Sequence, residues 1–288
     1  MDQTQLKELL DQAIAAACLA GHYTMKQYRV DVPFSSKGDD ASGGDYLTEV
    51  DLQSQELIID ALERHNNGFG ILAEEATQDA KPSHLEEDYF WCIDPLDGTR
   101  AFVEYNNGFS ISIALVSKDG QSQIGCIYLP VFNDLYYAAK GSGAFKNGRP
   151  VQMSDIQNQS FCLFTTRSEL LNPQNSLKVD SILKRLKEKH NIKKMTTMNH
   201  AGCVCNSCWV YDKAPALFFG FPREKGISIW DLAGVDCFIR ESGGWISDIF
   251  GNPLELNRAD STYMHHRGFV VASDKKLGED FVTAYQAV

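Results

Sequence analysis

Two aspartates follow an apolar run in the first half of the chain, and their positions suit a cation site. Residues 90–93 (FWCI) are typical of a buried strand, and the segment DPLDGT at residues 94–99 comes directly after them. We expect the strand to end there, because Pro95 cannot donate a hydrogen bond to a neighbouring strand and Gly98 permits a sharp turn. The two carboxylates and the nearby backbone N–H groups would then face a hard cation and a phosphate. The alternative is an ordinary polar turn, since Asp, Pro and Gly are the commonest turn residues.

Other acidic positions share this pattern of a carboxylate at the end of a regular element. Glu74 follows the apolar run at residues 70–73, and Asp231 lies at the start of a predicted helix. Oxygen-only ligands are typical of Mg²⁺, which binds about six oxygens and keeps several waters, whereas zinc favours nitrogen or sulfur. Asp51 stands at the start of another predicted helix, where an aspartate is most often an N-terminal cap.

Three short motifs contain most of these acids. They are GILAEE at residues 70–75, DPLDGT at 94–99 and WDLAG at 230–234, and the segment GSGAFKNG at 141–148 accompanies them. Their order and spacing resemble those of the inositol monophosphatase family, the Mg²⁺-dependent and lithium-sensitive phosphomonoesterases. Each motif is short, but the ordered set is specific, and the resemblance covers nearly the whole chain. It implies a layered αβαβα sandwich with an antiparallel N-terminal sheet and a mixed C-terminal sheet.

The resemblance also implies two or three Mg²⁺ ions and gives the acidic positions their roles. The expected metal ligands are the side chains of Glu74, Asp94, Asp97 and Asp231 and the backbone carbonyl of Leu96. Asp51 matches the family acid that works with the motif threonine, here Thr99, and this role replaces the capping interpretation. Thr99 and Asp51 are expected to orient and deprotonate the water that attacks phosphorus in line with the ester oxygen. Glu74 is expected to take part in catalysis as well as in metal binding.

Substrate binding is assigned by the same resemblance. The expected contacts are Asp97, Gly98, Thr99, Asp231, Glu224 and Lys37. The N–H groups after Asp97 would hold the phosphate at a short helix N-terminus. Glu224 matches an acid that accepts hydrogen bonds from substrate hydroxyls, and its alternative is a solvated charge. Lys37 matches a family lysine on a mobile loop, but its interval to Asp51 is longer than in the animal enzymes.

The first half of the chain predicts helices around an antiparallel meander. Apolar residues recur at helical spacing over residues 5–28 and again over 52–64. After residue 108 the pattern changes to short strand-like runs, which are residues 109–115, 123–129 and 135–139. The dipeptide Asn147-Gly148 is a two-residue hairpin signal.

The second half alternates between strands and helices, which predicts a second α/β layer. The predicted strands are residues 161–165, 193–198, 217–219, 245–248 and 269–272. The predicted helices are residues 176–190, 202–211, 231–242 and 276–285. We therefore expect an α+β half at 1–152 with most metal ligands and an α/β half at 153–288 with Asp231 and the specificity residues. No flexible linker separates the halves, so we expect them to share an interface.

Composition excludes several classes of function. Lys and Arg total 27 against 38 for Asp and Glu, a formal charge of −11, which argues against general nucleic-acid or membrane binding. No apolar run approaches the roughly 20 residues that cross a bilayer, and residues 1–10 lack a signal pattern. The eight cysteines are scattered, which favours reduced thiols in the cytoplasm. Those at 203, 205 and 208 have no fourth ligand at zinc spacing, and we interpret them as core residues.

The sequence leaves the substrate open among small phosphate esters. Glu224 and the hairpin at 141–148 favour inositol 1-phosphate, which ranks first. The segment RAF at residues 100–102, after the DPLDGT motif, resembles the nucleotidase and histidinol-phosphate branches of the family more than the inositol enzymes. Arg223 before Glu224 could meet a second phosphate, so adenosine 3',5'-bisphosphate ranks next. A regulatory binding protein of the same fold would show degenerate motifs, and this sequence shows none. The family also implies a homodimer.

Overall fold

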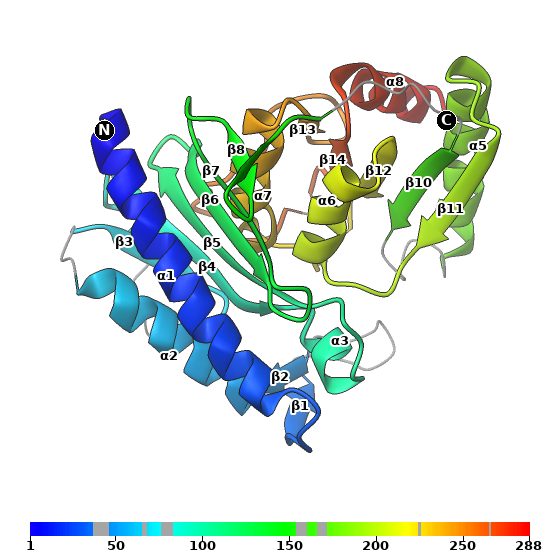
Figure 1. Cartoon of the computed structure of the whole chain (residues 1–288). Coiled ribbons are helices and arrows are strands. Elements are labelled where there is room, and N and C mark those ends of the chain that lie inside the picture. The colour runs from blue at the N-terminus through cyan, green and yellow to red at the C-terminus, as the bar shows by residue number, and fades with distance from the viewer. Residues whose placement is uncertain are drawn as a thin grey trace.

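The computed structural model describes residues 1–36, 46–64, 68–75, 83–153, 160–165, 172–223, 226–264 and 266–288. Two large sheets with helices outside and between them form five layers in the order αβαβα (Figure 1). Three hydrophobic clusters fill the spaces between successive layers. The predicted sandwich is confirmed.

The outer layer on one side consists of α1 (Gln3–Gln27) and α2 (Glu49–Glu63). The apolar stripe of α1 is buried against the first sheet, as its 3.6-residue spacing predicts. The second helix begins earlier than predicted, because Thr48 caps it by accepting from the N–H of Val50 at 3.1 Å and of Asp51 at 3.4 Å.

The first sheet has seven strands in the order β3-β4-β5-β6-β7-β8-β9. Their bounds are β3 (Gly70–Ala73), β4 (Tyr89–Asp97), β5 (Ser110–Ser117), β6 (Ser122–Leu129), β7 (Asp134–Ala139), β8 (Ala144–Lys146) and β9 (Arg149–Val151). From β4 onward each strand is antiparallel to the next, whereas β3 is parallel to β4. The hairpin between β8 and β9 turns at Asn147 and Gly148, whose φ angles of 50° and 78° fit a type I′ turn.

Strand β4 does not end before Pro95, so that prediction was wrong. The strand continues to Asp97, which pairs with Ser110, and the register shifts between Asp94 and Asp97. A bulge is one of the few places where a sheet accepts proline. The irregularity also changes which way side chains point, so that two residues three apart in sequence can face the same space.

The second sheet has five strands in the order β11-β10-β12-β14-β13. Their bounds are β10 (Ser160–Thr165), β11 (Lys194–Met198), β12 (Ala216–Gly220), β13 (Trp245–Ser247) and β14 (Phe269–Ala272). β10 is parallel to β11 and β12, and β14 is antiparallel to β12 and β13, which confirms a mixed sheet. Its outer face is covered by α5 (Pro173–Lys189) and α8 (Lys275–Gln286).

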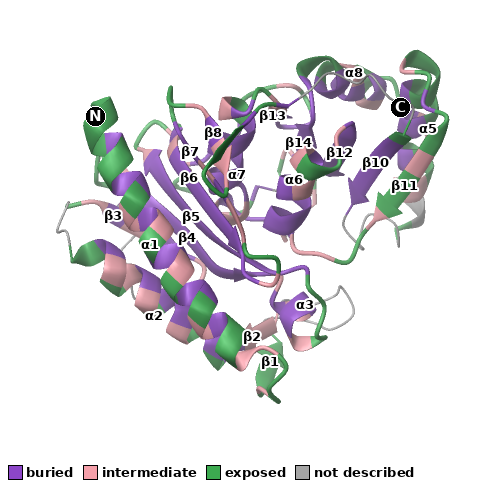
Figure 2. Ribbon diagram, in the orientation of Figure 1, coloured by how far each residue is buried: buried purple, intermediate pink, exposed green. Residues whose placement is uncertain are grey.

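The central helical layer consists of α6 (Cys203–Asp212) and α7 (Ile229–Glu241), which lie between the two sheets (Figures 1 and 2). Cys203, Cys205 and Cys208 are buried in this layer, as interpreted from the sequence. Smaller elements complete the described chain: β1 (Phe34–Ser36), β2 (Tyr46–Thr48), the 3₁₀ turn η2 (Ser83–Leu85) and α3 (Thr99–Val103).

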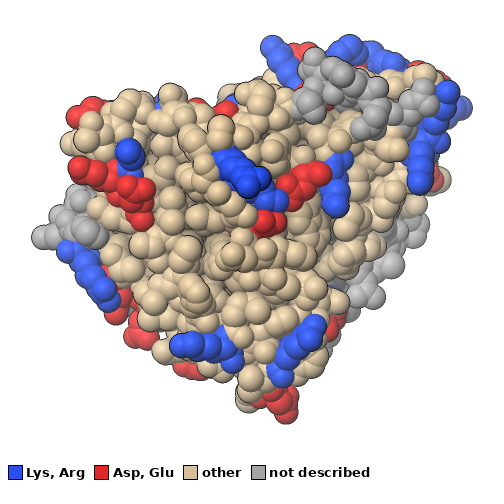
Figure 3. Space-filling view, viewed as in Figure 1, with Lys and Arg blue, Asp and Glu red and all other residues tan. Residues whose placement is uncertain are grey.

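Acidic and basic side chains are interspersed on the face shown in Figure 3, with basic ones gathered over α5. No helix in the described part of the chain combines the length and apolar content that crossing a membrane requires.

Candidate metal centre

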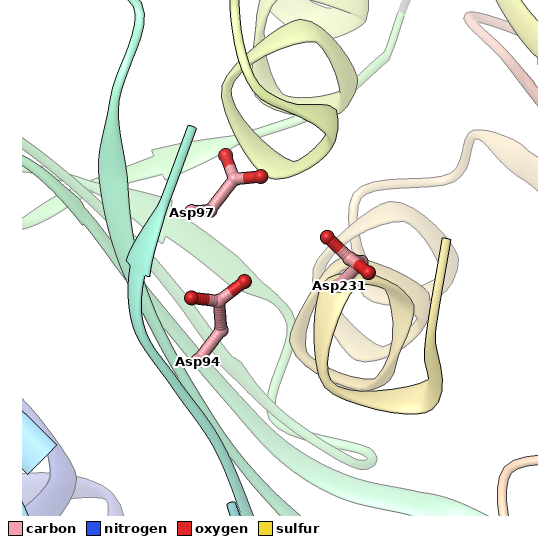
Figure 4. Close-up of side chains that lie close together, drawn as sticks. All are labelled: Asp94, Asp97 and Asp231. Carbon is pink, nitrogen blue, oxygen red and sulfur yellow. The ribbon is translucent and has the colours of Figure 1, made fainter. Parts of the chain in front are cut away.

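Three carboxylates converge where β4 meets the first turn of α7. Asp94, Asp97 and Asp231 each offer an oxygen, and these oxygens lie within 4.8 Å of one another. Figure 4 shows the three side chains pointing into one space, two from the strand and one from the helix. Asp94 and Asp97 are buried and Asp231 is half-buried. Positions far apart in sequence are thus brought together as the motifs predicted.

Local backbone contacts fix the orientation of two of these carboxylates. Asp94 Oδ1 accepts a hydrogen bond from the Leu96 N–H at 3.1 Å, across the bulge. Asp231 Oδ2 accepts from the Ser228 N–H at 2.6 Å, because Asp231 is the third residue of α7 and Ser228 precedes the helix. This contact is one arm of a capping box, so a common helix-start motif also aims a carboxylate.

Most hydrogen bonds to the Asp97 carboxylate come from the second half of the chain. Its Oδ1 accepts from the Cys203 N–H at 2.9 Å, and its Oδ2 accepts from the N–H groups of Val204 at 3.1 Å and Cys205 at 3.3 Å. Ser110 Oγ donates to Oδ2 at 2.9 Å. The free N–H groups of the first turn of α6 are thereby satisfied by a side chain that is distant in sequence. The only sequence signal was Gly202 before α6, a residue without a capping side chain.

Thr99 and Asp51 form a buried hydrogen-bonded pair beside this cluster. The Thr99 hydroxyl donates to Asp51 Oδ1 at 2.8 Å and lies 3.1 Å from the Leu96 carbonyl oxygen. Asp51 Oδ2 accepts from the backbone N–H of Thr48 at 2.8 Å, as the third residue of α2. Asp51 therefore has both properties that the sequence suggested as alternatives: it belongs to a capping box, and it contacts Thr99.

The remaining predicted residues are placed as follows. Glu74 follows β3, is half-buried, and lies close enough to Asp94 to raise its pKa by charge repulsion and hydrogen bonding. Gly98 has a φ of 79° and precedes α3. Lys37 and Glu224 lie outside the described residues.

Arg223 and Arg100 occupy different surroundings. Arg223 lines a small cavity with Ile227 and Met264, and its positive charge opposes the rise in the Cys203 pKa. Arg100 packs over the Tyr46 ring, 5.0 Å from its centre, and its Nε lies 3.6 Å from a Glu104 oxygen. Of these two arginines, Arg223 is the one whose charge acts on Cys203, the first residue of α6.

Burial raises the pKa values of the clustered carboxyls. Desolvation is the main cause for Asp51, whose pKa rises to about 6, and for Asp97, whose pKa rises to about 7. The pKa of Asp94 is raised well above its usual range by burial and then by Glu74, Asp97 and Asp231. Buried carboxylates that repel one another form an all-oxygen donor set, which suits a hard divalent cation.

We expect the stability of the metal-free protein to fall as pH rises from about 5 to about 7.5. The folded-state pKa values of Asp51 and Asp97, about 6 and about 7, lie above the unfolded value near 3.8. The folded state therefore binds more protons, and the stability that protonation provides is lost as pH rises through these values. The measurement is Tm against pH after treatment with EDTA.

Millimolar Mg²⁺ should raise Tm more at pH 7.5 than at pH 5.5, since a cation that binds only the folded, ionised site stabilises it by mass action. The variant Asp97→Asn should show a shallower fall of Tm with pH. A Tm of the chelated protein that rises steadily across this interval would contradict the assignment of the raised pKa values.

Comparison with protein families shows one match over almost the whole chain. The model described as "Inositol monophosphatase family" matches residues 5–288. Among curated proteins, inositol monophosphatase 1 of Sus scrofa is 26% identical over 98% of this chain and 95% of its own. A histidinol-phosphatase of Chlorobaculum parvum is 31% identical over 84% of this chain and 86% of its own.

Solved structures agree at the level of the fold. An IMPase of Thermotoga maritima superposes with a TM-score of 0.72 at 22% identity, covering 96% of each chain. The layers described above are therefore the fold of that protein.

Proposed function

The chain belongs to the inositol monophosphatase family, and we propose that it hydrolyses inositol 1-phosphate with the help of Mg²⁺. The family is one of phosphomonoesterases, so the chain is a phosphoric monoester hydrolase that acts on small phosphorylated substrates. The observation that supports the metal-dependent reaction most is the convergence of Asp94, Asp97 and Asp231 within 4.8 Å, beside the Thr99–Asp51 pair.

Two or three Mg²⁺ ions are proposed to be held by the acidic cluster. The proposed ligands are Glu74, Asp94, Asp97 and Asp231 and the carbonyl of Leu96. Bound cations would supply charge neutralisation and Lewis acidity to a phosphate dianion that otherwise repels a nucleophile. The buried and mutually repelling carboxyls of this chain support that arrangement, because a divalent cation offsets their charge.

Thr99 and Asp51 are proposed to handle the proton of the attacking water. Because the Thr99 hydroxyl donates to Asp51 Oδ1, the lone pairs of Thr99 Oγ1 are available to accept from a water. The proton would pass from water to Thr99 Oγ1 as the Thr99 proton moves to Asp51 Oδ1. The pKa of Asp51, about 6, lies close to neutral pH, and a general base is most effective when its pKa is near the pH of the reaction.

Phosphate contacts are proposed for Gly98 and Thr99, at the first turn of α3, where backbone N–H groups lack helical partners. Lys37 and Glu224 remain proposed substrate contacts on the basis of the family resemblance alone. Glu74 is proposed to assist catalysis through its place beside Asp94.

Inositol 1-phosphate is our first choice of substrate, and two alternatives have specific support. The whole-chain family match and the pig relative favour inositol phosphate. The relative from Chlorobaculum parvum supports histidinol phosphate. Arg223, whose charge acts on Cys203 at the start of α6, supports a substrate with a second phosphate, such as adenosine 3',5'-bisphosphate.

A substrate panel tests this ranking. Phosphate release should be measured with inositol 1-phosphate, adenosine 3',5'-bisphosphate, histidinol phosphate and fructose 1,6-bisphosphate, each with Mg²⁺ and with EDTA. We expect kcat/KM for inositol 1-phosphate to exceed the others by at least about tenfold, worth about 1.4 kcal/mol in the transition state. Release that is equal with and without Mg²⁺ would contradict the proposal and favour a regulatory binding protein.

Arg223→Gln is the matched variant for the panel. It should leave inositol 1-phosphate turnover unchanged if that is the substrate. A selective loss of kcat/KM for the bisphosphate, together with a preference of the wild type for it, would instead identify a bisphosphate nucleotidase.

We also propose a cytoplasmic, lithium-sensitive homodimer. The eight cysteines are unpaired and seven are buried, which supports a reducing compartment. The dimer and the lithium sensitivity are proposed from the family resemblance, and the division of the chain after residue 152 from the change in its sequence pattern.

A further inference from the structure

We propose that Gly202 is a positioning residue for Asp97, because its missing side chain lets the first turn of α6 dock directly on the Asp97 carboxylate. Asp97 comes from the first sheet and α6 from the central layer, so the contact sets the relation between two layers at the candidate site. The inference rests on the proposed cation site, but it is tested by cation binding rather than by turnover.

Three glycines from separate segments meet at this contact. The Gly202 N–H donates to the Gly108 carbonyl oxygen at 2.8 Å. A Cβ on Gly98 would lie 2.7 Å from that same oxygen and 3.2 Å from Gly202 N and Cα. A Cβ on Gly108 would lie 2.6 Å from Ala201 Cα. Backbone therefore packs directly on backbone where the two layers join.

Glycine is required at position 202 because a side chain would have no space there, and not because the backbone conformation is unusual. Its φ of −59° and ψ of 167° are accessible to any L-residue. A Cβ there would lie 2.2 Å from Asp97 Oδ2 and 2.6 Å from Asp97 Cγ and Oδ1, closer than real Cβ atoms approach other heavy atoms. Gly98 differs, because its φ of 79° would strain a side chain regardless of space. Alanine at 202 therefore isolates the steric contact with Asp97.

The contact matters because it fixes the carboxylate before any cation arrives. Within the described residues, Asp97 Oδ2 accepts three hydrogen bonds, from Ser110, Val204 and Cys205, and Oδ1 accepts one, from Cys203. This uneven pattern holds Oδ2 against α6 and leaves Oδ1 with more lone-pair capacity. A methyl group at 202 would push the carboxylate away from the α6 donors and disturb its spacing from Asp94 and Asp231. Sites whose ligands are held in place bind more tightly than sites that must be ordered.

The experiment compares direct Mn²⁺ binding, by titration calorimetry of the full chain, in the wild type, Gly202→Ala and Gly21→Ala. The control has a similar steric conflict in a different hydrophobic cluster, between α1 and the first sheet, since a Cβ on Gly21 would lie 2.4 Å from the Tyr128 ring. We expect Gly202→Ala to weaken Mn²⁺ affinity at least tenfold and Gly21→Ala to change it less than twofold, even if both lower Tm. Equal affinity of Gly202→Ala and the wild type would overturn the proposal.

A third variant keeps the test decisive if Gly202→Ala does not fold. Ser110→Ala removes one of the Asp97 donors without introducing a clash, and we expect it to weaken Mn²⁺ binding about threefold to tenfold. In that case, an unchanged Mn²⁺ affinity of Ser110→Ala would overturn the proposal, because cation binding would then not depend on how the Asp97 carboxylate is held. A wild type that binds Mn²⁺ but releases no phosphate would contradict the proposed function while leaving this inference to be decided by the variants.

Discussion

Replacing Asp94 with asparagine should lower kcat for phosphate release by about three orders of magnitude while the protein remains folded. Asn keeps the shape of the side chain and an oxygen that can accept from the Leu96 N–H, so the bulge in β4 should persist. It removes one of the three converging negative charges on which a cation would depend. The measurement is steady-state phosphate release at saturating Mg²⁺, with circular dichroism to verify folding.

The same variant should be more stable than the wild type when both are free of metal. Burial and the charges of Glu74, Asp97 and Asp231 raise the pKa of Asp94, so ionising it costs free energy in the folded state. An exposed aspartate on α2 provides the matched control: Asp60→Asn should change neither kcat nor Tm. An Asp94→Asn protein that keeps wild-type activity would show that this carboxylate takes no part in the reaction.

Replacing Thr99 with valine should lower kcat by about 10²- to 10³-fold, with a smaller effect on KM. Valine has nearly the volume of threonine but lacks the hydroxyl that donates to Asp51 Oδ1 at 2.8 Å. The path for the proton of the attacking water is then broken. The measurement is kcat and KM on the preferred substrate of the panel, across pH 5.5 to 8.5.

Thr99→Ser supplies the control, because serine restores the hydroxyl and should recover most of the activity. Mn²⁺ affinity should be close to that of the wild type in both Thr99 variants, since neither changes a proposed side-chain ligand. If valine and serine at 99 gave the same kcat, a proton-transfer role for the hydroxyl would be ruled out.

The sequence predicted the elements and the convergence of the acids well, for physical reasons. The α1 stripe repeats every 3.6 residues and the meander strands alternate or run apolar, so both patterns follow directly from burial. The acids follow or begin such elements, and an aspartate at the third position of a helix is aimed by its capping box. Asp51 and Asp231 share this arrangement, so the sequence pattern that caps each helix also directs a carboxylate toward the proposed site.

Other features could not be read from the sequence because they depend on contacts between distant segments. The continuation of β4 through Pro95 requires the partner strand β5, whose Ser110 pairs with Asp97. The parallel pairing of β3 with β4 depends on the route of the chain between them. The contact between α6 and Asp97 joins residues more than one hundred positions apart, and its local signal is weak, a glycine at position 202 that has no capping side chain.

Anomalous diffraction from crystals grown with Mn²⁺ would show whether Asp94, Asp97 and Asp231 hold a divalent cation. We expect an anomalous peak between these three carboxylates in the wild type, and its loss or marked weakening in Asp94→Asn. Mn²⁺ peaks found only elsewhere on the molecule, with no cation between the three carboxylates, would contradict it.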